Sequence, residues 1–126
     1  MSAKHAIVLL AHGSRDAQWA QPFERLAALL AKHSSCPVRL AYLELMRPAL
    51  PEALDALAHE GASAIRVVPV FLGAGGHVKQ DLPRLVQEAR ERHPRLRVEI
   101  DAPIGEQDAV LAAIAAAISS PARRGP

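Results

Sequence analysis

The sequence predicts a single α/β domain in which a four-stranded parallel sheet lies between two layers of helices. Four short apolar or β-branched segments alternate with four segments that show the helical period. The starts of the apolar segments lie about 30 residues apart, which is the length of a strand–helix–strand repeat. The chain has 126 residues, enough for one domain. Together these observations favour a three-layer α/β/α architecture.

The four predicted strands are residues 6–11, 38–45, 64–72 and 96–100. The first is a continuous apolar run, which is typical of a parallel strand that is buried on both faces. In a doubly wound sheet we expect the strand order 2-1-3-4. That order makes the first three strands neighbours and places their carboxyl ends at one edge of the sheet.

The segments between the strands carry apolar stripes with helical spacing. The four stripes begin at Trp19, Leu50, Leu82 and Val110. Pro22 and Pro83 fit a helix only in its first turn, and they are therefore expected near two helix starts. Residues 119–126 lack the pattern. We therefore expect a domain spanning residues 1–118 and a flexible tail over residues 119–126.

Composition and charge exclude several classes of protein. The formal net charge is +2 and the charges are interspersed, so nucleic acid is not an expected partner. The apolar run 6–11 is too short to act as a signal segment or to cross a bilayer. Cys36 is the only cysteine, which fits a reducing compartment. The sequence thus predicts a cytoplasmic protein that binds neither nucleic acid nor membranes.

Polar side chains follow the three strands that are expected to be neighbours. His12 comes directly after the first strand, Glu44 lies near the end of the second, and His77 follows the glycine-rich residues 73–76 after the third. Neighbouring strands lie about 4.8 Å apart, so these groups can meet around one ion. Two imidazoles and a carboxylate suit divalent cobalt, nickel, iron or zinc. His12, His77 and Glu44 are the predicted metal ligands and catalytic residues.

The other four histidines are expected to be structural. His33, His59 and His93 each fall in the last turn of a predicted helix, where the helix dipole favours a partial positive charge. His5 precedes the first strand, at the opposite edge of the sheet.

The residues around the two candidate histidines suit a flat, anionic ligand. The predicted substrate-binding residues are Ser14, Arg15, Arg47, Gly75, Gly76 and Lys79. The cationic members, together with helix N-termini, would bind carboxylates. The glycine spacing matches neither the dinucleotide-binding nor the Walker pattern, and it would instead let the backbone lie close to a flat ligand. Three structural alternatives stay open: a plain connector at the glycines, an ion pair between Glu44 and Arg47, and solvated basic side chains.

Three motifs resemble those of the short-form class II tetrapyrrole metal chelatases, the sirohydrochlorin cobaltochelatase family. They are AHGSRD at residues 11–16, ELMRP at 44–48 and VVPVFLGAGGHVKQDLP at 67–83, and the likeness extends over about residues 5–118. The resemblance implies a chelatase-like fold. It also implies ATP-independent insertion of a divalent metal into sirohydrochlorin, during cobalamin or siroheme synthesis. Cobalt, iron or nickel would be the substrate, and no organic cofactor would be required.

The same resemblance implies roles for particular residues. His12 and His77 would lie at the metal and tetrapyrrole site, and Glu44 would contact the metal. Long relatives fuse two such domains in one chain, so a homodimer is expected here. Metal insertion must remove two pyrrole protons, and a neutral imidazole can ligate a metal or accept a proton near physiological pH. Which histidine is the base and which is the ligand stays open, although His77, expected on a flexible loop, is the one we expect to move.

Three other functions remain open at this stage. A metal carrier or sensor would use the same three ligands without a tetrapyrrole pocket. A flavodoxin-like nucleotide binder would share the fold class, but its first loop would be rich in serine, threonine and glycine, unlike residues 12–16. A degenerate structural partner of a larger chelatase complex is the third.

Overall fold

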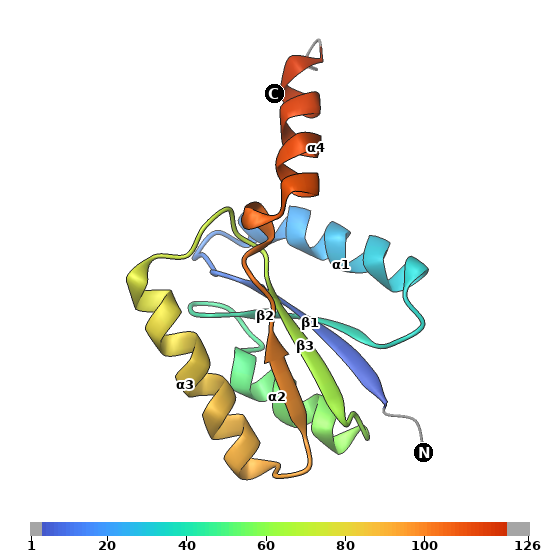
Figure 1. The fold of residues 1–126 in the computed structure, drawn as a ribbon, viewed down its shortest axis with the longest axis vertical. Coiled ribbons are helices and arrows are strands. Elements are labelled where there is room, and N and C mark those ends of the chain that lie inside the picture. The colour runs from blue at the N-terminus through green and yellow to red at the C-terminus, as the bar shows by residue number, and fades with distance from the viewer. Residues whose placement is uncertain (1–3, 121–126) are drawn as a thin grey trace.

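A computed structural model describes residues 4–120 and contains one four-stranded parallel sheet (Figure 1). The strands are β1 (His5–Ala11), β2 (Val38–Tyr42), β3 (Ala64–Pro69) and β4 (Arg97–Ile100). Their order is β2-β1-β3-β4, and all three pairings are parallel. The predicted fold class and strand order are confirmed.

Two strands end earlier than the sequence indicates. β2 stops at Tyr42 because residues 43–48 turn back on themselves, and the Tyr42 amide donates to the Pro48 carbonyl (3.0 Å). β3 ends at Pro69, although the Val70 amide still donates to the Leu10 carbonyl (2.8 Å). The segments that follow both strands therefore have no regular secondary structure, and their side chains can contribute to a site.

The helices are α1 (Gln21–His33), α2 (Leu50–His59), α3 (Gly76–Arg92) and α4 (Asp108–Ser119). Short 3-10 turns precede two of them: η1 (Ala17–Ala20) before α1, and η2 (Ile104–Glu106) before α4. Pro22 lies in the first turn of α1, as predicted.

The prediction for Pro83 is wrong, because α3 begins seven residues before it and Pro83 lies inside the helix. Proline lacks the N–H that would bond the carbonyl of Lys79 one turn earlier. Both residues are exposed, so water can satisfy that carbonyl. As a consequence His77 is the second residue of α3, not part of a loop as expected.

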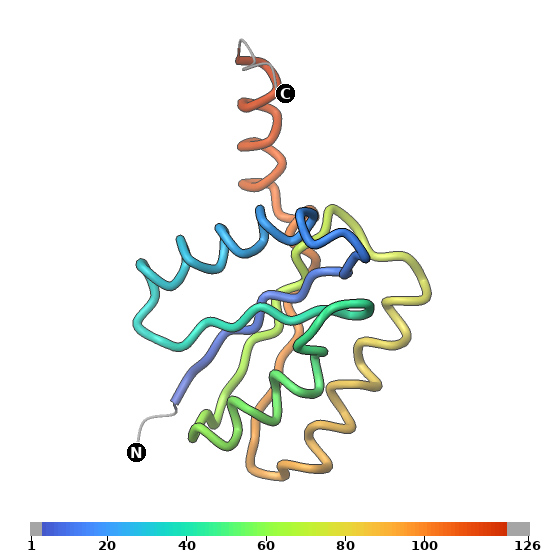
Figure 2. Tube along the Cα trace, turned by 180° about the vertical axis from the view of Figure 1, so that it is seen from behind, coloured from blue at the N-terminus to red at the C-terminus, as the bar shows by residue number. Residues whose placement is uncertain are grey.

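The two faces of the sheet pack against different helices. Ala6, Val8 and Leu10 of β1 join the main core with α2 and α3, while Ala11 faces a smaller cluster beneath η1 and α1. Figure 2 shows the same arrangement from behind. Residues alternate between the faces of a strand, and the core side chains therefore follow directly from the sequence pattern.

Helix α4 does not take part in these layers. It continues from η2 away from the sheet, packs substantially only with η2, and has no buried residue (Figure 1). The predicted helix is present, but its apolar stripe is not buried against any other part of residues 4–120. Ser119 still belongs to α4, and residues 121–126 of the predicted tail lie outside the described residues. Within residues 4–120, no helix has both the length and the apolarity that a membrane crossing requires.

The start of α2 offers a test of electrostatic stabilisation. Glu52 accepts a hydrogen bond from the Ala49 amide (2.9 Å) and pairs with the guanidinium of Arg47. Hydrogen bonds from Arg47 and then from Ala49 lower the pKa of Glu52 from 4.5 to about 2. Because the folded-state pKa is depressed, the stabilisation is complete above the unfolded pKa and is lost as the pH falls from about 4.5 towards 2.

Glu52→Gln keeps an acceptor for the Ala49 amide but removes the charge. We expect the variant to melt at a lower temperature than the parent chain at pH 7, and the difference to close as the pH falls below about 4.5. Thermal unfolding followed by circular dichroism between pH 7 and pH 2 measures this. A difference that stays constant over the whole range would contradict the assignment.

Candidate functional site at the carboxyl edge of the sheet

His12 lies immediately after β1 and is held against an aromatic ring. Its imidazole packs on Phe71, which follows the neighbouring strand β3, with ring centroids 4.5 Å apart and planes tilted by 38°. Because β1 and β3 pair directly, their two exit loops meet at this contact. The imidazole is exposed but has a fixed neighbour.

Gly13 brings the exit loop of β1 against that of β2. Its φ angle is +103°, and a Cβ atom at this position would lie 1.8 Å from the carbonyl oxygen of Glu44. The Glu44 amide donates to the His12 carbonyl (3.1 Å). Only glycine fits both the positive φ and the close approach. Gly13 therefore fixes Glu44 beside His12.

The turn after Glu44 has a strained backbone. Leu45 adopts a φ of +66° and its side chain is exposed, while the Met46 amide donates back to the Glu44 carbonyl (2.8 Å). A leucine in the left-handed region costs free energy, and such strain often accompanies functional sites. The Arg47–Pro48 peptide bond that follows is cis.

His77 extends from the first turn of α3 into solvent, with 92% of its side chain exposed. Its Nε2 atom lies 3.2 Å from Oδ2 of Asp81, one turn further along the helix. Arg84 lies 3.8 Å from the other oxygen of Asp81 and also pairs with Glu88 (2.8 Å). The first turns of α3 thus present His77 followed by Asp81, Arg84 and Glu88, whose charges alternate in sign.

The loops and α3 enclose a cavity of about 410 Å³. Its lining residues are His12, Leu43, Glu44, His77, Val78, Asp81, Arg84 and Leu85. The structure therefore brings His12, Glu44 and His77 to the border of one cavity. Among residues 4–120, however, no three histidine, cysteine or acidic side chains lie close enough to hold a metal ion. The three side chains face a shared open space, and their role as a ligand set stays a prediction.

Asp81 and Arg84 were not found from the sequence. Their signal was the helical spacing from His77, at four and seven residues, which places all three side chains on one face of α3. This spacing places the three side chains on one helix face only because α3 begins at Gly76, a start that the sequence did not indicate.

The predicted substrate-binding residues lie around the cavity but do not line it. Arg47 pairs with Glu52 and not with Glu44, so that alternative for Glu44 is not realised. The Ser14 hydroxyl accepts from the Asp16 amide (3.1 Å) and stabilises a turn, while Arg15 is exposed. Lys79 lines a smaller neighbouring hollow of about 150 Å³.

Gly75 and Gly76 stand beside open space. No atom lies within 4 Å of a Cβ added to either residue, and neither has a positive φ. Their conformations thus do not require glycine. The predicted approach of a flat ligand is consistent with this open space.

The histidines that were expected to be structural lie elsewhere. His93 Nε2 lies 2.8 Å from Asp55 of α2, and the ring of His59 meets the ring of His93 edge-on. These contacts tie the end of α3 to α2. His33 is the last residue of α1, and His5 lies at the opposite edge of the sheet.

The fold and the cavity define a class of protein. Parallel α/β domains bind small ligands at the carboxyl edge of the sheet, where loops from neighbouring strands diverge. This chain has its cavity, two histidines and a row of charges at that edge. The CbiX family model matches residues 6–120, and the chain belongs to the CbiX family.

Individual relatives agree with this assignment. The chain is 32% identical over 112 residues to the sirohydrochlorin ferrochelatase of Bacillus subtilis (strain 168), covering 88% of this chain and 43% of that protein. It is 30% identical over 106 residues to the sirohydrochlorin cobaltochelatase of Sulfurisphaera tokodaii, covering 84% of each. This chain thus spans less than half of the ferrochelatase and most of the cobaltochelatase.

Solved structures show the same fold. The putative cobalamin biosynthesis CbiX protein from Marinobacter aquaeolei VT8 superimposes with a TM-score of 0.81 at 33% identity, covering 90% of this chain and 93% of that one. The sirohydrochlorin chelatase SirB from Bacillus subtilis subspecies spizizenii, solved in complex with cobalt, gives a TM-score of 0.80 at 32% identity. That match covers 91% of this chain and 50% of the SirB chain.

Proposed function

We propose that this protein is a sirohydrochlorin metal chelatase, which inserts a divalent metal into sirohydrochlorin without ATP. The observation that carries the proposal is the cavity that His12, Glu44 and His77 border in a chain of the CbiX family. One of the relatives described above is named a ferrochelatase and the other a cobaltochelatase. We propose cobalt as the first candidate substrate, with iron and nickel as alternatives, in the synthesis of cobalamin or siroheme.

His77 is suited to remove the pyrrole protons. Its Nε2 atom lies 3.2 Å from the Asp81 carboxylate at the border of the cavity, and a neutral imidazole there offers a nitrogen lone pair as a base or a ligand. His12, packed on Phe71, supplies a second imidazole with a defined place. Glu44 and Asp81 can balance the charge of the incoming ion. The reaction exchanges ligands and protons but no electrons, and an organic cofactor is not needed.

Sirohydrochlorin carries several carboxylates, and cations at the rim of the cavity suit them. Arg84 lines the cavity and Lys79 the neighbouring hollow, while the N-terminus of α3 at Gly76 directs amide groups outward. Helix N-termini and guanidinium groups both bind carboxylates well. Arg15 and Arg47 lie outside the cavity but are exposed on adjacent loops.

We infer that the active unit is a homodimer. Within residues 4–120 of one chain, no three potential ligands converge on an ion, so a second copy facing this edge would complete the site. The chain also spans 43% of the ferrochelatase and 50% of the cobalt-bound chelatase. The proposed location is the cytoplasm, since a lone cysteine fits a reducing compartment.

An absorbance assay tests the activity directly. Purified protein is mixed with sirohydrochlorin and Co²⁺, and the spectrum of the tetrapyrrole is followed against a protein-free control. Faster spectral conversion with the protein is expected. Binding of Co²⁺ without faster conversion would favour a metal carrier or sensor, and would overturn the chelatase proposal. Repeating the assay with Fe²⁺ and Ni²⁺ ranks the metals.

The open space at Gly75 gives a prediction about substrate binding. Gly75→Val should raise the KM for sirohydrochlorin by about tenfold or more because the side chain fills the space where the macrocycle would approach. The melting temperature should fall only slightly, since nothing in the fold lies within 4 Å and the only cost is that valine is a poorer N-cap than glycine for α3. Steady-state kinetics and thermal unfolding measure the two effects.

Gly105→Ala is the control for the thermal unfolding measurement, because it is a glycine substitution that is expected to destabilise the fold. A Cβ at Gly105 would lie 2.2 Å from the backbone of Leu72, so this variant should melt at a lower temperature. A Gly75→Val chain with an unchanged KM would show that the substrate does not approach this loop.

A further inference from the structure

His77 and Asp81 form a pair of potential metal ligands at the start of α3. They are four residues apart, so their side chains are neighbours on one face of the helix. The His77 Nε2 atom lies 3.2 Å from Asp81 Oδ2. Nitrogen and oxygen ligands lie about 2.0–2.2 Å from a divalent ion such as zinc, so two of them on one ion are roughly 3 Å apart. The two atoms are thus already spaced as neighbouring ligands of one ion.

The charges around this pair leave the Oδ2 atom of Asp81 open to a cation. Arg84 approaches the other oxygen, Oδ1, at 3.8 Å, and its guanidinium lies closer to Glu88 (2.8 Å). One guanidinium between two carboxylates leaves a net negative charge on this face of the helix, which attracts a cation. The His77 side chain is 92% exposed, and the pair is therefore accessible to a hydrated ion.

The histidine–aspartate pair at the other end of α3 is arranged differently. His93 Nε2 lies 2.8 Å from Oδ1 of Asp55, but Arg92 Nε also lies 3.1 Å from that same oxygen. A guanidinium therefore occupies the place that an ion would need. The contacts of this second pair join α2 to α3, and neither His93 nor Asp55 lines the candidate cavity. The comparison favours the pair at the start of α3 as the one that can accept an ion.

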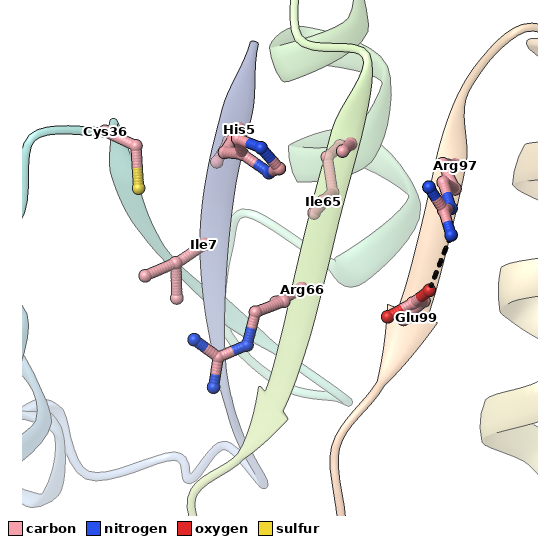
Figure 3. A pocket seen from close by; sticks show the side chains of 9 residues that line it. His5, Ile7, Cys36, Ile65, Arg66, Arg97 and Glu99 are labelled. Atoms are coloured by element: carbon pink, nitrogen blue, oxygen red, sulfur yellow. Dashed lines mark ion pairs between the residues drawn. The ribbon is translucent and has the colours of Figure 1, made fainter. Parts of the chain in front are cut away.

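A second cavity holds other potential ligands, but they do not converge. It has a volume of about 350 Å³, lies over β1, β3 and β4, and includes His5, Cys36 and Glu99 in its lining (Figure 3). These three residues come from separate segments, with β3 between the strands of His5 and Glu99. Glu99 is also paired with Arg97 (3.6 Å). Suitable residue types are therefore not sufficient, and the spacing of the ligand atoms distinguishes the pair on α3.

We propose that Asp81, together with His77, captures the metal ion from solvent and holds it until it enters the tetrapyrrole. This deepens the proposed function, and the delivery step rests on it. In residues 4–120 no third histidine, cysteine or acidic side chain joins the pair, so water fills the other positions around the ion. Each additional protein ligand would add a bond that has to be broken. A pair of ligands therefore suits an ion that must be passed on.

The capture pair borders the cavity in which the tetrapyrrole is proposed to bind. His77 and Asp81 line the same 410 Å³ cavity as His12 and Glu44. When the ion binds Nε2, the neutral imidazole carries its one proton on Nδ1. When the ion leaves for the pyrrole nitrogens, the Nε2 lone pair is free again to accept one of the two protons that those nitrogens lose. The same atom thus releases a metal ion and receives a proton.

Cobalt binding without a tetrapyrrole tests the capture pair. The background chain carries His12→Ala and Cys36→Ser, which remove the other imidazole of the cavity and the thiol, and isothermal titration calorimetry with Co²⁺ measures its affinity. In this background Asp81→Asn should weaken Co²⁺ binding by about tenfold or more, a scale that even the hydrogen-bond partners of metal ligands reach. The amide keeps the shape of the side chain and removes its charge.

Glu91→Gln in the same background is the matched control. It removes one carboxylate from an exposed position further along α3 and should change the affinity by less than about twofold. Equal losses in the two variants would mean that only the overall charge of α3 attracts the ion, and the proposal would be wrong. The same conclusion would follow if Asp81→Asn bound Co²⁺ as tightly as its background, or if the background chain bound none.

Steady-state kinetics separate capture of the metal from the chemical step. In the otherwise unchanged chain, Asp81→Asn should raise the KM for Co²⁺ by about tenfold or more, while the KM for sirohydrochlorin and the rate at saturating Co²⁺ stay close to those of the parent. A loss of rate that saturating Co²⁺ does not restore would contradict a role in capture. Cobalt binding that depends on Asp81, in a protein that does not convert sirohydrochlorin, would leave the capture pair standing and overturn only the proposed function.

Discussion

Replacing His77 by alanine is expected to lower the rate of metal insertion by about 10²-fold or more, which is the usual effect of removing a positioned acid–base group. The imidazole lies at the border of the 410 Å³ cavity with Nε2 beside Asp81, and alanine removes both the lone pair and that contact. The fold should not change, because 92% of the side chain is exposed. Single-turnover absorbance measurements with Co²⁺ and sirohydrochlorin give the rate directly.

His93→Ala is the control for this experiment. His93 also lies close to an aspartate (2.8 Å to Asp55), but the pair lies at the far end of α3, away from the cavity. Its loss should change the melting temperature and not the rate. If His77→Ala and His93→Ala were equally active, the assignment of the site would be wrong.

Replacing Gly13 by alanine is expected to destabilise the fold by about 3 kcal/mol, and so to lower the melting temperature by about 10 °C. The added Cβ would lie 1.8 Å from the Glu44 carbonyl oxygen, and φ is +103°. The two exit loops would have to separate. We therefore expect chelatase activity to fall even at temperatures where the variant is folded.

Gly73→Ala is the matched control, since no atom lies within 4 Å of its added Cβ and its φ is not positive. Thermal unfolding and the absorbance assay should show a near-normal protein. A Gly13→Ala chain that melted with the parent would show that the contact between the two loops is not a constraint.

The fold could be predicted because its pattern is local. Apolar runs separated by helical stripes identify a parallel sheet, and the connections between them allow few strand orders. The same logic placed His12 and Glu44 at one edge of the sheet, because each follows a strand end.

The positions of the α3 side chains and the packing of α4 could not be predicted, because the hydrophobic pattern does not specify where a helix begins or which surface it covers. The position of His77 depends on where α3 begins, and Pro83 indicated a later start than the structure has. A proline on an exposed helix face costs one hydrogen bond, which tertiary packing can outweigh. Asp81 and Arg84 were missed for that reason. The apolar stripe of α4 predicted a helix correctly, but a stripe does not specify which surface it will cover.

The exit loop of β3 is anchored at its start and unrestrained further along. Phe71 and Leu72 are held by His12 and by the tightly packed Gly105, whereas the space beside Gly73 and Gly75 is empty. His12 is therefore held by its neighbours at one end of this loop, while His77 at the other end is carried by α3, whose Leu82 and Val86 are buried in the core. The distance between the two imidazoles is thus set by packed elements on either side of the loop, and residues 73–75 can change without moving either ring.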